Sequence, residues 1–78
     1  MQVNQTVTGM YMGSIPFRGV ITSLRSLTVK TDGAFEHMID LAEPVTVFGE
    51  QRTNLIVTTK FDGQPSSYTR HTDSLCAT

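Results

Sequence analysis

His37 is the side chain best placed for acid–base or metal chemistry, because the carboxylates of Glu36 and Asp40 are close to it in sequence. On a strand His37 points away from both acids, and on a helix it lies to one side of the pair that they form at i and i+4. Neither arrangement supplies the ligands that a metal ion requires. His37 is therefore predicted to be a structural or surface histidine, and no metal and no cofactor is expected.

Nucleophilic catalysis is not indicated either. Cys76 is the one cysteine of the chain and has no neighbouring base in the sequence, so it is interpreted as an exposed free thiol. The serines stand in no G-x-S-x-G context, and the glycine-rich motifs that bind phosphates are absent. No catalytic residue is predicted, and the chain is not expected to be an enzyme.

Charge is nearly balanced, with six basic and seven acidic residues. This balance creates no strong field for nucleic acid or an anionic membrane. A bulge between Arg18 and Arg25 would place both on one face of a strand, where they could hold a small anionic ligand. Together with Lys30, Arg52 and nearby aromatic rings, they also suggest a single-stranded nucleic-acid surface as an alternative.

An apolar cluster around Tyr11 and Phe17 suggests a contact surface. Met10 and Met12 flank Tyr11, and methionine and tyrosine are enriched at protein interfaces. The competing interpretation places these side chains in the core. The predicted partner- or ligand-binding residues are Tyr11, Phe17, Arg18, Arg25 and Arg52.

The elements that must position these residues are strands. Valine, isoleucine and threonine number 23 of the 78 residues, against 13 for alanine, leucine, glutamate and lysine. Side chains branched at Cβ suit the pleated surface of a sheet. Alternating patterns and turn residues predict five strands, near residues 6–12, 17–29, 35–41, 45–48 and 55–59.

These strands predict an all-β fold: a small five-stranded antiparallel barrel, partly closed and SH3- or Sm-like in style. The alternative keeps the sheet but makes residues 34–42 a short helix, because Phe35, Met38 and Ile39 also fit a helical stripe. Residues 1–59 are expected to form the domain. Residues 60–78 show no period and are expected to be a flexible polar tail.

A chain of this length builds a thin core, and its strands carry apolar side chains on both faces. We therefore expect a non-enzymatic binding module that self-associates and engages a protein or a small anionic ligand through its strand faces. The alternatives are the nucleic-acid-binding barrel and an enzyme whose site, with residues such as Tyr11, Arg25, Glu36 and His37, is shared between subunits. No membrane-spanning run is visible, and the expected setting is the cytoplasm, as for a phage or plasmid accessory protein.

Overall fold

The computed structural model describes residues 1–27, 33–65 and 73–78, and within them the chain forms one antiparallel sheet without any helix. The strands are β1 (Thr6–Tyr11), β2 (Ile15–Ser26), β3 (Ala34–Val47), β4 (Glu50–Lys60) and β5 (Ser74–Ala77). The predicted all-β class and the antiparallel arrangement of five strands are therefore confirmed. No helix in these ranges is long and apolar enough to span a bilayer.

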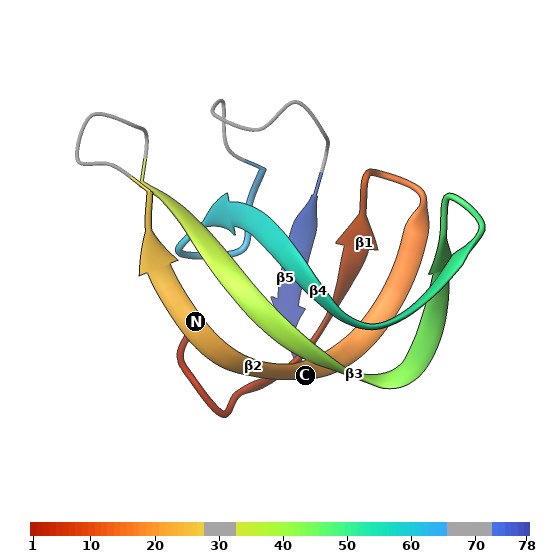
Figure 1. Cartoon of the computed structure of the whole chain (residues 1–78). Helices are drawn as coiled ribbons and strands as arrows, with labels where there is room; N and C mark the ends of the chain where they lie inside the picture. Colours follow the sequence, from red (N-terminus) through yellow and green to blue (C-terminus); the bar gives the residue numbers. More distant parts are fainter. Residues whose placement is uncertain (28–32, 66–72) are drawn as a thin grey trace.

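The sheet has the order β4-β3-β2-β1-β5 and is strongly curled (Figure 1). It is not closed, because β4 and β5 form its two edges. The loop after β4 nevertheless reaches β5, where the N–H of Leu75 donates to the carbonyl of Gly63 at 3.0 Å. A Cβ on Gly63 would collide with the Leu75 carbonyl, so this close approach requires glycine.

The segment that sequence left ambiguous is a strand, and the alternative of a helix over 34–42 is wrong. Burial alternates along it: His37 and Ile39 are buried, whereas Met38 and Asp40 are exposed. Cross-strand partners on both sides enforce this period, with β2 on one edge and β4 on the other. The expected strands 35–41 and 45–48 are a single element, β3, because Pro44 bulges the strand without ending it.

The fifth strand of the sheet is not one of the five that were expected. Residues 74–77, at the end of the expected polar tail, form β5 against β1. Leu75 packs into the core, and Asp73 beside it is buried, its Oδ1 accepting the N–H of Met12 at 2.7 Å. A strand of four residues is too short for its alternation to stand out in sequence. Parts of the expected tail and of the strand 17–29 lie outside the described residues, as does Lys30.

The core lies on the concave side of the curl and draws on all five strands. Fully buried apolar side chains include Val7 on β1, Ile21 on β2, Ile39 on β3 and Val57 on β4. Gly9 allows β5 to approach β1, because a Cβ there would collide with the Ser74 carbonyl and lie 2.9 Å from Cζ of Phe17. The core therefore fixes the position of Phe17, the residue on which the site below is built.

Candidate functional site: a hollow between diverging strands

β2 and β3 pair with each other over only about half of their length. Their ladder ends at the pair Gly19↔Leu41, after which β2 pairs with β1 and β3 pairs with β4. Gly19 marks the last close approach, because a Cβ there would collide with the carbonyl of Asp40. Beyond this point the two strands diverge and leave a space between them.

A bulge of several residues in β3 causes the divergence. Asp40 pairs with Asn54 and Val45 pairs with Arg52, so residues 41–44 of β3 face one residue of β4. Pro44 lies inside this bulge and has no N–H to donate. The bulge bends β3 away from β2.

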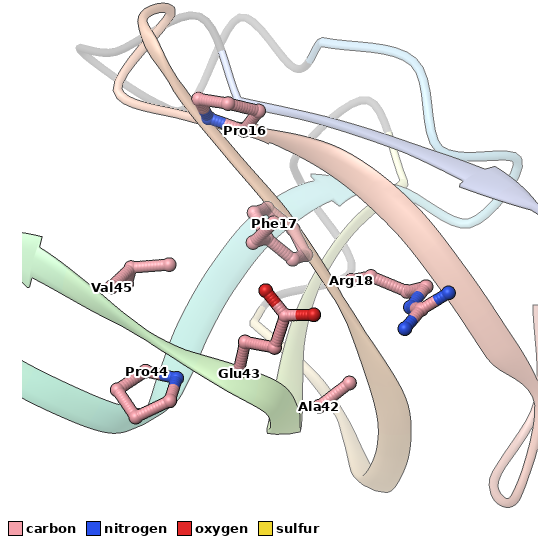
Figure 2. A pocket seen from close by; sticks show the side chains of 7 residues that line it. All are labelled: Pro16, Phe17, Arg18, Ala42, Glu43, Pro44 and Val45. Atoms are coloured by element: carbon pink, nitrogen blue, oxygen red, sulfur yellow. The ribbon is translucent and has the colours of Figure 1, made fainter.

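The space holds a hollow of about 340 Å³, which we call the β2–β3 hollow (Figure 2). Its lining comes from three residues of β2 and four of β3: Pro16, Phe17, Arg18, Ala42, Glu43, Pro44 and Val45. Phe17 is buried and belongs to the core, whereas the two prolines and Ala42 are exposed. The lining is therefore mixed: five of the seven residues are apolar, and polar atoms contribute about as much of the lining surface as apolar ones.

One cation and one anion stand at the rim of the hollow. Arg18 lies on β2 and Glu43 on β3, and Figure 2 shows the side chain of Glu43 extending from β3 toward Phe17. In the described part of the chain, the two make no ion pair with each other. Both residues are exposed, so a molecule that binds in the hollow can contact their side chains.

Backbone hydrogen bonds of β2 define what it presents to the hollow. The N–H of Ile21 donates to Gln5 and its carbonyl accepts from Asn4, so odd-numbered residues of β2 bond toward β1. Even-numbered residues therefore direct their backbone toward β3. Pro16 is one of these, and it has no N–H to offer. With Pro44 on the opposite wall, both sides of the hollow lack a donor that an added strand would need.

A second hollow, of about 430 Å³, lies beside the first on the outer face of the sheet. Arg18 and Ala42 line both hollows. The remaining lining of the second comes mostly from small or polar side chains: Thr6, Thr8, Gly19, Val20, Asp40 and Thr78. Arg18 is thus the charged side chain common to both spaces.

The structure brings three of the five predicted site residues to one place. Phe17 and Arg18 line the β2–β3 hollow, and Arg52 lies opposite Val45, another lining residue. Residues directly opposite in an antiparallel pair share a face, with Cβ atoms about 4.5–5.5 Å apart. Arg52 therefore stands next to the hollow.

Tyr11 and Arg25 do not join this group. Tyr11 pairs with Ile15 at the end of β1 and packs against the core. A bulge between Ile21 and Ser23 does place Arg18 and Arg25 on the same face of β2, but seven residues apart, which is roughly 23 Å along a strand. Arg25 is 78% exposed and forms a 4.0 Å ion pair with Glu36.

The predicted site residues do not include Pro16, Ala42, Glu43, Pro44 or Val45, which also line the hollow. A proline inside an otherwise strand-like stretch was the available signal for a bulge or an edge.

His37 is a core residue in the structure. Its Nδ1 donates to the carbonyl of Val57 at 3.1 Å, and its Nε2 is buried without a hydrogen-bond partner in the described residues. Burial lowers the pKa of His37 below 6.5, outweighing the opposing effect of the hydrogen bond to Val57. The imidazole is therefore held neutral.

Other groups able to do chemistry stand apart. Cys76 lies exposed on β5. Within the described ranges, no three histidine, cysteine, aspartate or glutamate side chains gather where they could hold a metal ion. Comparison of the chain with protein-family models, curated proteins and solved structures finds no match.

Proposed function

We propose that this chain is a non-enzymatic protein-binding module whose β2–β3 hollow receives an apolar side chain from a protein partner. The observation that carries the proposal is the hollow itself: a space between two strands with the rings of Pro16, Phe17 and Pro44 in its lining and charges of both signs, Arg18 and Glu43, beside them. Buried aromatic or aliphatic anchors in such pockets supply most of the binding energy of protein interfaces.

The hollow suits a side chain better than an added strand. Strand addition uses backbone N–H and carbonyl groups at a free edge. Pro16 and Pro44 each lack the N–H, so a strand entering here would leave its own carbonyls unpaired. An apolar side chain needs no such partner, and it would contact the two pyrrolidine rings, Phe17 and Val45.

Rim charge favours a protein over a small anionic ligand. An anion drawn to Arg18 would also meet Glu43 in the same hollow and Asp40 in the adjoining one. A protein surface carries charges of both signs and satisfies both rim residues. For single-stranded nucleic acid, the described residues offer no favouring observation, because Arg25 is paired with Glu36 and lies far along β2 from Arg18.

The curl of the sheet suits the same proposal. We propose that it acts as a partly closed barrel, SH3- or Sm-like in style. The contact between the two edge strands, with the Gly63–Leu75 hydrogen bond, supports this. A curled sheet held at its edges keeps β2 and β3 rigid where they diverge, and rigid walls reduce the entropy lost on binding.

A titration with N-acetyl-phenylalanine amide, followed by amide NMR shifts, tests the proposal. We expect shifts at Phe17, Arg18, Ala42 and Val45 and none at Arg25 or Glu36. N-acetyl-alanine amide, which has the same backbone but no ring, serves as the matched control and should shift these signals far less. Inorganic phosphate is the competing probe. If phosphate shifts the amide signals of the lining residues and the phenylalanine amide does not, the hollow binds anionic ligands and the proposal is wrong.

A further inference from the structure

Phe48 at the tip of the β3–β4 hairpin is the most exposed large apolar side chain among the described residues, at 86%. Val47 pairs with Glu50, so Phe48 and Gly49 form a two-residue turn, and both have positive φ, 50° and 80°. Asparagine followed by glycine is the usual choice for such a turn, and a bulky side chain at positive φ is strained. The conformation of this turn therefore disfavours phenylalanine at position 48, and the aromatic ring is nevertheless exposed there.

The tip of this hairpin matches the β2–β3 hollow in size. The side chains of Pro16, Phe17, Pro44 and Val45 form the apolar part of the lining, and the volume of about 340 Å³ is near the lower end for sites that take ring-bearing ligands. Aromatic rings are the usual anchors for pockets of this kind. Phe48 does not fill the hollow of its own chain, because its ring is exposed.

Charges near the tip complement the rim. Glu50 and Arg52 follow Phe48 on β4, and both are exposed. The rim of the hollow carries Arg18 and Glu43. A hairpin entering the hollow therefore brings an acid for Arg18 and an arginine for Glu43, the two charged residues of the lining.

We propose that the protein partner of the hollow is a second copy of this chain, whose Phe48 enters it. The inference rests on the proposed function of the hollow and names its occupant. Val45 lines the hollow and Phe48 lies three residues further along the same hairpin, about 10 Å at the rise of a strand. Because hollow and anchor lie at one end of the molecule, one twofold axis lets each copy insert its Phe48 into the other, giving a closed dimer.

Sedimentation equilibrium of the intact chain up to millimolar concentration tests the inference. We expect the native chain to form a dimer and Phe48→Asn to weaken the dimer by about 30-fold or more, as for an interface anchor. Phe48→Asn also suits the positive φ of the turn, so it should melt at a higher temperature than the native chain. Phe61→Asn is the control, since Phe61 is 53% exposed and outside the hairpin; this variant loses the ring contact with Phe35 and should still leave the dimer intact.

Mixing two variants tests the contact itself. Phe48→Asn leaves the hollow open without an anchor, and Ala42→Trp fills the hollow but keeps the anchor. Each variant alone should be monomeric, and their mixture should form a heterodimer with one of the two contacts. A native dimer that persists in Phe48→Asn, or two monomeric variants that fail to associate, would overturn the assignment.

A monomeric native chain would also overturn the inference, and the N-acetyl-phenylalanine amide titration of that monomer then separates the two proposals. Shifts at Phe17 and Val45 would leave the hollow a protein-binding site with another partner. No shift would remove the proposed function as well.

Discussion

Val45 and Arg52 lie directly opposite each other across the β3–β4 ladder, just beyond the bulge that sets residues 41–44 against one residue of β4. This pair explains how a hollow and a charged hairpin come to share one end of the molecule. The bulge turns β3 from β2 and opens the hollow, and renewed pairing at Val45 rebuilds a regular hairpin that carries Phe48.

Removal of the buried histidine should change how stability depends on pH. Because burial lowers the pKa of His37 below 6.5, the unfolded chain binds more protons than the folded chain at mildly acidic pH. The contribution of His37 to the free energy of unfolding is therefore fully present above about pH 6.5. It is lost as the pH falls from 6.5 to the lower pKa of the folded state. Urea unfolding of the native chain and of His37→Leu across this range should show a smaller pH slope in the variant.

The slope, and not the absolute stability, is the test, because His37→Leu also leaves the carbonyl of Val57 without its donor. An equal pH slope in the two proteins would contradict a neutral, buried His37.

A side chain at Gly9 should loosen β5. A methyl group there would collide with the carbonyl of Ser74 and crowd Phe17, so β5 must shift from β1. We expect Gly9→Ala to destabilise the fold by about 1–3 kcal/mol, the usual cost of overpacking. Amide exchange at Leu75 and Ala77 should accelerate. Thr8→Ala on the same strand adds no atom and is the control; equal exchange in both variants would show that β5 does not depend on this close approach.

Asp73 should fix the start of β5 to the β1–β2 turn. Its Oδ1 accepts the N–H of Met12 at 2.7 Å, and the side chain is buried. Asp73→Ala removes this acceptor and should cost about 1–3 kcal/mol in thermal or urea unfolding. Asp73→Asn retains an oxygen acceptor and should lose less. If asparagine proves as costly as alanine, the hydrogen bond is not what stabilises this junction.

Sequence alone predicted the strand content because branched residues and alternation are local properties. The alternation of buried and exposed residues from His37 to Asp40 is one such pattern, although residues 34–42 also fitted a helix until β2 and β4 supplied partners. β5 was not predicted, because polar residues surround its single core side chain, Leu75, in the sequence.

The candidate site was only partly predictable. Phe17 and Arg18 were recognised from residue type, since an aromatic beside an arginine suits a binding surface. Their connection with Glu43 and Arg52 depends on the register of β3 against β4 and on how many residues the bulge takes up. Register is a tertiary property that neither composition nor period reveals.

Reversal of the rim charge should weaken association and be repaired from the other side. Arg18→Glu places a carboxylate opposite Glu50 of the second copy and should weaken the dimer about two- to fivefold, the range for exposed pairs. Glu50→Arg added to Arg18→Glu restores opposite charges and should recover the loss in sedimentation equilibrium at low salt. Additive losses in the double variant would mean that the two residues do not meet.

The most direct measurement is an isotope-filtered NOE experiment on an equal mixture of labelled and unlabelled native chains at the concentration where they associate. We predict cross-peaks between the ring protons of Phe48 in one copy and the methyl groups of Val45 in the other. Intermolecular cross-peaks that instead join Met38 and Ile56, which are exposed opposite each other on the outer face, would contradict the account.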